Sequence, residues 1–334
     1  METILVTGGT GFVGNHVVRR LCEAHHRVKV FARKTSPMKT VQGLPVEVCI
    51  GDLLDRASLD RAVQGCTAVF HVAADYRLWA PDPSELFRNN VEGTENVLAA
   101  SKNAGVQRVV YTSTVGTMAF SKDGKLATEE AFPVPSALTG AYKQSKFLAE
   151  QVAFRYASDG LPVVIVNPSA PVGEGDFKPT DTGKIILNFL NRRLSAWIDT
   201  GLCLTDIRDV AQGHLLAWQK GRPGQRYILG GTNMSFKDIM DTLAHLTGLA
   251  PPLIRLPHFI ALAAGFVDST LSRFTKKSPR IPLDGVRMAR YKMYVSSAKA
   301  ERELGYRHGP IEPALERAIR WFQENGMVTS AAKG

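Results

Sequence analysis

The chain has 334 residues, of which 44 % are hydrophobic and 22 % are charged. This composition is typical of a globular protein with one large domain and a smaller lobe, and it excludes a disordered or fibrous chain. The formal net charge of +10 is compatible with phosphorylated ligands, but no basic tail, zinc finger or aromatic–basic RNA motif is present, so we expect no nucleic-acid partner.

Strand and helix patterns alternate along the first half of the chain. Short apolar runs predict strands at Thr3–Thr7, Arg27–Ala32, Val46–Ile50, Ala68–Val72, Arg108–Thr112 and Pro162–Val166. Helical spacing of apolar residues predicts helices at Phe12–Glu23, Ser58–Val63, Ser84–Ala104 and Thr139–Ser158. Alternation of this kind predicts parallel βαβ units, and continuous apolar strands indicate a sheet covered on both faces. The predicted fold is therefore α/β, with a doubly wound parallel Rossmann sheet.

The pattern changes after Asn167. Residues 168–183 are rich in Pro, Gly and Asp and are predicted to form a loop. One further strand is predicted at Arg226–Leu229, and helices at Thr182–Leu194, Asp206–Lys220, Ser235–Thr247, Pro257–Arg273, Leu283–Arg290 and Ile311–Asn325. We expect a dinucleotide-binding domain of residues 1–167, to which about 205–230 returns, and a smaller, mostly helical C-terminal substrate lobe of residues 168–204 and 231–330.

A glycine-rich turn follows the first predicted strand. Residues 7–14 read T-G-G-T-G-F-V-G, with glycines at Gly8, Gly11 and Gly14. Glycines let backbone N–H groups approach a pyrophosphate, and the helix that begins here directs the positive end of its dipole at the phosphates. We therefore predict that this turn binds the cofactor through its three glycines and through Thr10, Phe12 and Val13.

The end of the second strand bears on which dinucleotide is bound. NAD-preferring sites usually carry an acid here, whereas this chain has Arg33 followed by Lys34. Arginine can bind a 2′-phosphate with two hydrogen bonds, so we predict NADP(H), with NAD as the less favoured alternative. Asp52 and Leu53 follow the third strand and are predicted to border the adenine, although Asp52 could instead cap a helix.

Residues 142–146 form a Tyr-x-x-x-Lys motif on a predicted helix. The i,i+4 spacing puts Tyr142 and Lys146 on one face, and a nearby ammonium is expected to lower the pKa of the phenol. Tyr142 would act as proton donor or acceptor for the substrate oxygen during hydride transfer. A hydroxyl at the end of the fifth strand should polarise the substrate carbonyl; Thr114 is our first choice and Ser113 the second, with Thr112 beside the cofactor.

These motifs resemble those of a known family. TGGTGFVG at 7–14, HVAA at 71–74, NVEGT at 90–94 and YKQSK at 142–146 together resemble the extended short-chain dehydrogenase/reductases of the NAD-dependent epimerase/dehydratase superfamily. Further stretches at 73–83, 166–183 and 282–290 are similar to those of hopanoid-associated sugar epimerases and dihydroflavonol-4-reductase-like proteins.

The resemblance implies roles for matched positions. Ala73, Ala74, Asn167, Pro168 and Ser169 would lie near the nicotinamide, and Asn90 would support the loop beside the sheet. Tyr76, Arg77 and Trp79 would contact substrate. The family usually has Ser where this chain has Thr114, which leaves the identity of the hydroxyl donor open. The resemblance also implies a homodimer through the helices Ser84–Ala104 and Thr139–Ser158.

Three functions remain open. The leading one is an NADPH-dependent carbonyl reductase, or the reverse alcohol oxidation, motivated by Arg33. A sugar-nucleotide epimerase with a retained cofactor is the alternative; its diphosphate site would need basic residues of the lobe, for which Lys184, Arg192, Arg193 and Arg287 are available. A non-catalytic NADP-binding sensor is the minor alternative.

Cysteine usage and hydropathy complete the expectations. Cys22, Cys49, Cys66 and Cys203 form no Cys-x-x-Cys pair, so we expect reduced thiols and no metal site. The N-terminus lacks signal-peptide features, and no apolar run is long enough to span a bilayer, so we expect a cytoplasmic protein. The apolar stretch Phe259–Val267 is expected to be a buried helix of the lobe, with contact to a membrane surface as the alternative.

Overall fold

The computed structural model describes residues 1–120, 124–134, 138–275, 279 and 281–329. Its main sheet has seven parallel strands in the order β10-β6-β5-β4-β1-β2-β3. Their bounds are β1 Thr3–Thr7, β2 Arg27–Ala32, β3 Val46–Ile50, β4 Ala68–His71, β5 Arg108–Thr112, β6 Val163–Pro168 and β10 Arg226–Leu229. The predicted doubly wound parallel sheet is confirmed.

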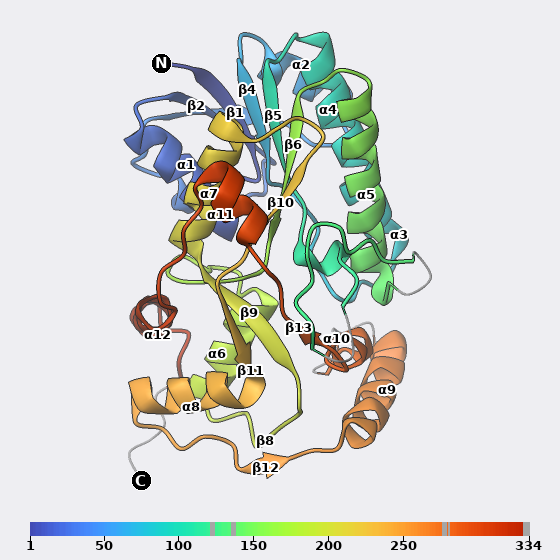
Figure 1. The fold of residues 1–334 in the computed structure, drawn as a ribbon, viewed down its shortest axis with the longest axis vertical. Helices are drawn as coiled ribbons and strands as arrows, with labels where there is room; N and C mark the ends of the chain where they lie inside the picture. The colour runs from blue at the N-terminus through green and yellow to red at the C-terminus, as the bar shows by residue number, and fades with distance from the viewer. Residues whose placement is uncertain (121–123, 135–137, 276–278, 280, 330–334) are drawn as a thin grey trace.

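Helices cover both faces of this sheet (Figure 1). Along β1, Ile4 and Val6 face a core cluster formed with α1 (Phe12–Glu23) and α7 (Ile207–Lys220), whereas Leu5 faces the cluster under the helices on the other side. Those helices are α2 Arg56–Val63, α4 Gly93–Asn103 and α5 Gly140–Ser158. Because successive side chains of a strand point to opposite faces, a strand buried on both sides must be apolar throughout.

The long helix predicted at Ser84–Ala104 is interrupted. It consists of α3 (Ser84–Phe87), a π-helical turn at Arg88–Glu92, and α4. The extra residue in a π turn rotates the side chains that follow it, and such turns are frequent at functional sites. Here the turn contains Asn90, whose amide contacts are described below, and a tertiary requirement of this kind leaves no trace in helical periodicity.

The C-terminal half contains a small sheet that the sequence analysis missed. β7 (Ala170–Val172) lies in the segment predicted as loop, and it pairs with β9 (Gly201–Asp206), as do β11 (Thr232–Ser235) and β13 (Lys292–Met293). A separate pair joins β8 (Ala196–Trp197) to β12 (Ile254–Arg255). Except for β9, these strands have only two to four residues, and β11 is half-buried along its length, so neither apolar runs nor strict alternation marks them.

The remaining helices of the C-terminal half complete the lobe. They are α6 Asp181–Leu190, α8 Phe236–Thr247, α9 His258–Thr275, α10 Leu283–Met288, α11 Ala298–Leu304 and α12 Glu312–Glu324. Helix α11 was not predicted and packs on α7 and β10 of the main sheet. Residues 276–278, 280 and 330, which belong to the predicted lobe, lie outside the described residues.

Helix α9 contradicts the expectation of a buried lobe helix. Phe259, Phe266 and Val267 are all exposed, because only its narrow face of small residues packs on α10. No helix of the described part of the chain is long and apolar enough to cross a membrane.

Candidate active site

The carboxyl ends of the parallel strands gather most of the predicted site residues. The sheet runs from β1 to β3 on one side of β1 and continues with β4 to β6 on the other, so the winding reverses between β1 and β4. Open α/β sheets bind ligands in the crevice outside the strand ends at such a reversal. The segments that follow β1, β4, β5 and β6 form the candidate site at this crevice.

The turn after β1 has a geometry that requires glycine at two positions. Gly8 has a φ of +72°, and a Cβ there would lie 2.6 Å from the backbone nitrogen of Ala73. A Cβ on Gly14 would overlap the carbonyl oxygen of Gly8, which also accepts a hydrogen bond from the Gly11 N–H at 2.9 Å. Helix α1 therefore begins directly on the turn, and its free N–H groups and dipole suit a pyrophosphate.

The other predicted residues of the turn are held by packing. Thr10 is buried, and its carbonyl accepts a hydrogen bond from the Thr40 hydroxyl at 3.1 Å. Phe12 lines a narrow cleft with Val172 of the lobe, and Val13 packs on the core under α1. The backbone N–H groups of Phe12 and Val13, rather than their side chains, are the groups available to a phosphate.

The residues predicted to hold the adenine half lie after β2 and β3. Arg33 and Lys34 are exposed. The Asp52 carboxylate accepts a hydrogen bond from a backbone N–H two residues on, while the side-chain cap of α2 is Asp55. Leu53 packs against the start of α4. Asp52 therefore closes a turn and is not the helix cap that the alternative interpretation suggested.

A buried histidine at the end of β4 was not singled out from the sequence. His71 makes hydrogen bonds through Nδ1 to the Thr7 hydroxyl at 2.7 Å and through Nε2 to the Thr94 hydroxyl at 3.1 Å. Burial lowers the pKa of His71 to about 3, so the ring is neutral. The Ala73 N–H donates to the same Thr7 hydroxyl, and Ala74 follows half-buried. This network ties the glycine turn to the loop after β4.

Asn90 connects the same loop to helix α5. Its Nδ2 donates to the Asp75 carbonyl and to the Ser145 hydroxyl, both at 2.9 Å, and its Oδ1 accepts from the Asp75 N–H at 2.7 Å. The amide thus supports the loop, as the resemblance implies, and its hydrogen bonds are directed to protein groups.

Tyr142 and Thr114 come together at the ends of α5 and β5. The Thr114 hydroxyl lies beside the phenol and acts on its pKa, and it accepts a hydrogen bond from the Gly116 N–H at 3.1 Å. Burial raises the pKa of Tyr142 to about 12, and the Thr114 hydroxyl acts in the opposite direction. The expectation that a nearby ammonium lowers this pKa is wrong for this arrangement, because the Lys146 amine is directed elsewhere.

Lys146 lies on the same helix face as Tyr142 but reaches toward β5. Its Nζ donates to the Tyr111 phenol at 3.0 Å and to the Thr112 carbonyl at 2.8 Å. Burial lowers the pKa of Lys146 to about 7, while the negative charge of Glu150 acts in the opposite direction. At neutral pH the amine is therefore close to its own titration point.

Two buried polar atoms beside this pair have no hydrogen-bond partner among the described residues. They are Ser113 Oγ and Asn167 Oδ1. Buried polar groups are rarely left unpaired, so each needs an explanation. The neighbouring predicted residues have other contacts. The Thr112 hydroxyl is hydrogen-bonded to a buried histidine of α7. Pro168 is the last residue of β6, and the Ser169 hydroxyl is hydrogen-bonded to a threonine of β9. The structure thus brings Thr114, and not Ser113, to Tyr142.

A buried ion pair lies one turn further along α5 and was missed in the sequence. Glu150 accepts from Arg226 at 2.8 Å, from the Thr117 hydroxyl at 2.9 Å and from the Asn167 amide at 2.8 Å. The side chains of Glu150 and Arg226 are 0 % and 3 % exposed. The available signal was weak: Glu150 is four residues after Lys146 on one face, and Arg226 opens an apolar strand.

The predicted substrate residues lie in the loop after β4. The Tyr76 hydroxyl donates to a backbone carbonyl of the loop after β7 at 3.3 Å, and Trp79 is half-buried. Arg77 is ion-paired with Asp75 at 2.6 Å and with Glu85 at 2.9 Å. The guanidinium of Arg77 is therefore already engaged by two carboxylates.

The basic residues considered for a diphosphate are at the surface. Lys184, Arg192, Arg193 and Arg287 are all exposed. Two of them, Lys184 and Arg287, are ion-paired with an aspartate three residues before them. Their placement therefore gives the epimerase alternative no buried diphosphate site.

Comparisons with known proteins agree with this geometry. Residues 4–230 match the model of the NAD dependent epimerase/dehydratase family. The chain is 45 % identical over 331 residues, 98 % of this chain and 96 % of the relative, to a protein of Synechocystis sp. named "Putative dihydroflavonol 4-reductase".

Solved structures show the same fold. A crystal structure of a protein named gox2253 is 40 % identical with a TM-score of 0.89, covering 98 % of this chain and 100 % of the other. A nucleoside-diphosphate-sugar epimerase from Pseudomonas aeruginosa is 27 % identical with a TM-score of 0.82, covering 98 % and 99 %. The resemblance and the fold class predicted from the sequence are confirmed.

Proposed function

Since the chain belongs to the NAD-dependent epimerase/dehydratase family and is an NAD(P)-dependent enzyme, we propose that it is an NADP(H)-dependent carbonyl reductase or alcohol dehydrogenase. Tyr142 is the acid/base of this reaction. The observation that carries the proposal is the placement of the Tyr142 phenol beside the Thr114 hydroxyl at the strand-end crevice, one helical turn from the buried Lys146. The division into a dinucleotide domain and a substrate lobe is part of the same proposal.

The residues at the crevice fit a nicotinamide dinucleotide. The glycine turn leaves no room for a Cβ at Gly8 or Gly14, so the backbone can approach a pyrophosphate closely. Ala73 and Ala74 then border the nicotinamide half, and Pro168 and Ser169 close it from β6. The unpartnered Ser113 Oγ and Asn167 Oδ1 offer polar groups on the same side. When bound, the cofactor supplies or accepts a hydride.

The protein's own residues handle the proton. Tyr142 donates a proton to the substrate oxygen in reduction and removes it in oxidation, with the Thr114 hydroxyl holding that oxygen beside the phenol. Its pKa of about 12 keeps the phenol protonated at neutral pH, which suits the donor role in reduction. Because the amine of Lys146 has a pKa of about 7, a modest change in its surroundings at neutral pH changes its charge.

A nucleotide-sugar epimerase is the second candidate, favoured by the Pseudomonas aeruginosa epimerase with its TM-score of 0.82. An epimerase retains its cofactor through the cycle, whereas a reductase releases it. The purified protein is therefore denatured and assayed for nicotinamide dinucleotide. We expect none at stoichiometric level, together with NADPH-dependent turnover of carbonyl compounds; stoichiometric retained NAD would favour the epimerase.

The Tyr142→Phe variant tests the acid/base in the same assays. Removing the hydroxyl should lower turnover by about 10²- to 10⁴-fold while leaving the dissociation constant for the cofactor unchanged. Activity that survived in this variant would overturn the assignment of Tyr142. Loss of cofactor binding would show instead that the change disturbs the fold of the crevice.

The preference for NADP(H) rests on Arg33 and Lys34, which are both exposed after β2. We expect Arg33→Ala to raise the dissociation constant for NADPH about tenfold, because a bidentate contact to the 2′-phosphate is lost, with little change for NADH. Fluorescence titration with both cofactors measures this. Equal effects on NADPH and NADH would contradict the preference, and Arg27→Ala, an exposed arginine at the other end of β2, is the matched control.

A homodimer through the helices that begin at Ser84 and Gly140 is the remaining part of the proposal. Leu148 on α5 is an exposed apolar residue of this surface, and α4 and α5 lie side by side (Figure 1). A two-fold pairing of these helices would cover Leu148.

A further inference from the structure

The buried positions of helix α9 carry small residues, and most of its large apolar residues are exposed. Ala261, Gly265 and Ser272 are buried, and a Cβ on Gly265 would lie 3.3 Å from Val286 of α10. A helix of a water-exposed surface normally buries its bulky apolar residues and exposes polar ones. The inner face of α9 reverses that rule.

The outer face of α9 is apolar and open. Phe259, Phe266 and Phe274 are 71 %, 62 % and 83 % exposed, and their spacing of seven and eight residues keeps them on one side of the helix. The α9 face is defined by Phe259, Ile260, Phe266, Val267, Leu271 and Phe274, all of them exposed. A contiguous apolar surface of this kind marks an interaction site.

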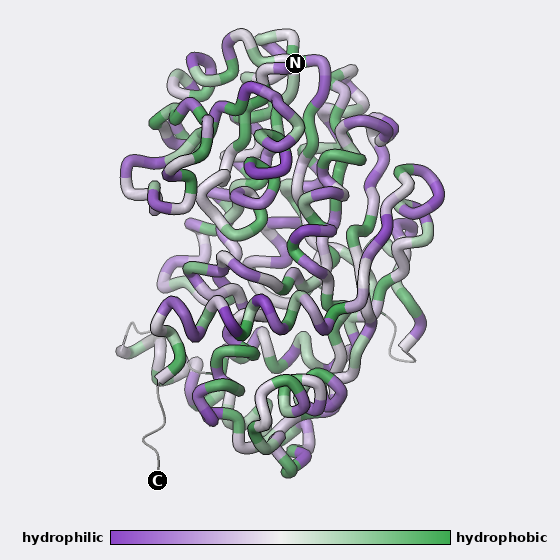
Figure 2. The backbone as a smooth tube through the Cα atoms, turned by 90° about the vertical axis from the view of Figure 1, so that its left-hand side faces the viewer, coloured by the Kyte–Doolittle hydropathy of each residue, from purple (hydrophilic) through white to green (hydrophobic). Residues whose placement is uncertain are grey.

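The strand that leads into α9 continues this surface. Leu253 and Ile254, at β12, are also exposed. Figure 1 places β12 and α9 together at the end of the molecule away from the main sheet, and Figure 2 shows hydrophobic stretches at the same end. The apolar residues thus occupy one end of the lobe and are not scattered over it.

Charge around the α9 face favours an anionic surface. Residues 253–293 contain eight lysines and arginines but only two acidic residues, so they carry +6 of the chain's net +10. Among the described residues, Arg255, Arg287 and Arg290 are exposed. Arg255 and Arg287 are ion-paired with Asp199 and Asp284 at the surface, whereas Arg290 forms no ion pair within the described part of the chain. Anionic lipids attract basic residues that flank an apolar helix face.

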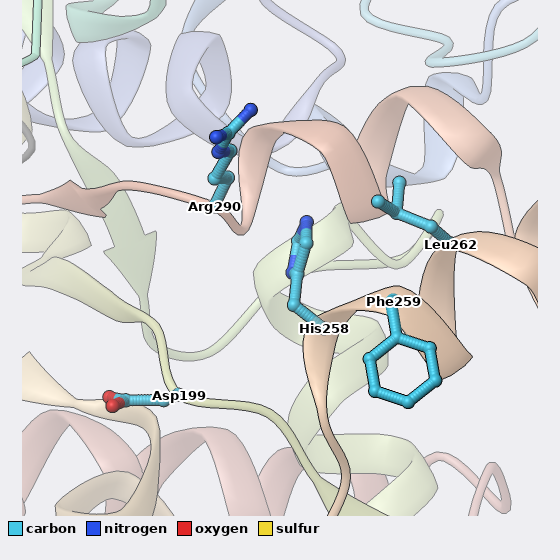
Figure 3. A pocket seen from close by; sticks show the side chains of 5 residues that line it. All are labelled: Asp199, His258, Phe259, Leu262 and Arg290. Atoms are coloured by element: carbon cyan, nitrogen blue, oxygen red, sulfur yellow. The ribbon is translucent and has the colours of Figure 1, made fainter.

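An open pocket with polar and apolar lining residues lies at the start of α9, at the edge of its apolar face. The pocket of about 450 Å³ is lined by Asp199, His258, Phe259, Leu262 and Arg290. Figure 3 shows Phe259 turned away from the neighbouring His258. The Nε2 of His258 is buried and has no hydrogen-bond partner within the described part of the chain. Asp199 also lines this pocket, and its carboxylate is already ion-paired with Arg255 and Lys292, so His258 and Arg290 are the groups that can bind the phosphate of a lipid headgroup beside the apolar face.

We propose that the α9 face docks on the surface of an anionic lipid bilayer. The helix lies in the plane of the surface with its phenylalanines among the acyl chains, the basic residues at the headgroups, and no segment crossing the bilayer. Helix α10 packs on α9 and also approaches the start of α5, where a Cβ on Gly140 would lie 2.6 Å from the carboxylate of Asp284. Docking therefore brings the end of the site near Tyr142 close to the bilayer.

The test is co-sedimentation of the purified chain with lipid vesicles. One set contains phosphatidylcholine alone and the other an equal mixture of phosphatidylcholine and phosphatidylglycerol. We expect binding to the mixed vesicles that weakens as salt rises. The double variant Phe266→Glu with Phe274→Glu should bind at least about tenfold more weakly. The matched control, Val48→Glu with Leu126→Glu, changes two exposed apolar residues elsewhere and should bind as the parent does.

Thermal melting and light scattering accompany the test. The two phenylalanines are exposed, so the double variant should melt as the parent does. Absence of binding by the parent, equal binding to both vesicle types, or undiminished binding by the double variant would each overturn the proposal. A parent that is larger than the double variant in light scattering and binds no vesicles would show that a second copy of the chain covers the α9 face.

Discussion

Two buried ionisable side chains on helix α5, Glu150 and Lys146, differ in the charge of their hydrogen-bond partners. Glu150 receives hydrogen bonds from Arg226, Thr117 and Asn167, so its charge is fully compensated. One turn earlier, the amine of Lys146 contacts only neutral groups of β5, and burial lowers its pKa to about 7. The same helix thus carries a rigid framework at one turn and a titratable group at the next.

This difference between Glu150 and Lys146 indicates which buried charged groups serve structure and which serve function. A buried ion pair with complete hydrogen bonding holds segments together and gives no proton-transfer capacity at neutral pH. A buried base without a paired acid is destabilising on its own, and such groups cluster at functional sites. This criterion supports the proposal that Lys146 and Tyr142 carry the chemistry, whereas Glu150 with Arg226 holds α5 against β6 and β10.

The largest effect is expected from Glu150→Gln. The neutral amide leaves the buried Arg226 without a counter-charge, which should lower the free energy of unfolding by about 3–5 kcal/mol, seen by urea denaturation. Glu95→Gln is the matched control. Glu95 of α4 forms a surface ion pair with Arg155 of α5, and surface ion pairs contribute about 0–1 kcal/mol. Similar losses in both variants would contradict the framework role of Glu150.

A smaller effect, on rate and not on stability, is expected at the end of β5. Thr114→Ala removes the hydroxyl that contacts Tyr142 and should lower kcat by about 10²-fold. Thr114→Ser keeps the hydroxyl and should retain most of the activity. Ser113→Ala removes a buried hydroxyl without a partner among the described residues and should leave the melting temperature unchanged or raise it. A greater loss of kcat in Ser113→Ala than in Thr114→Ala would exchange the roles of the two residues.

The smallest effect is a pH-dependent gain in stability from Lys146→Met. The folded-state pKa of Lys146 is about 7, and an unfolded lysine titrates near ~10.4, so between these pH values the unfolded chain binds more protons. Stability therefore rises with pH across this window and is lowest below it. The groups that face the Lys146 amine are Tyr111 and His71, which are neutral, and Glu150, which is the only nearby acid in the described network.

Lys146→Met removes this penalty. The variant should melt above the parent at pH 6, and the difference should shrink as pH rises and disappear near the unfolded-state pKa of about 10.4. Its catalytic activity should be lost at every pH. A variant that melts below the parent at pH 6 would show that the amine stabilises the fold.

Sequence reasoning predicted the parts of the site that depend on local spacing. The glycine turn and the Tyr-x-x-x-Lys motif each place groups a few residues apart, so strand, turn and helix geometry already fixes which face they share. The main sheet followed for the same reason, since its apolar runs are long. The strands of the lobe were missed because most of them have only two or three residues and because their pairing joins segments far apart in the chain.

The amino-acid sequence by itself determined the sheet, the turn for the dinucleotide and the face of α5 that carries Tyr142 and Lys146. Only the tertiary structure decided that the Lys146 amine reaches β5, that Glu150 meets Arg226 from 76 residues away, and that α9 exposes its phenylalanines. Local patterns constrain the backbone, but the partner of a buried charge and the exposure of a helix face depend on which distant segments pack against them.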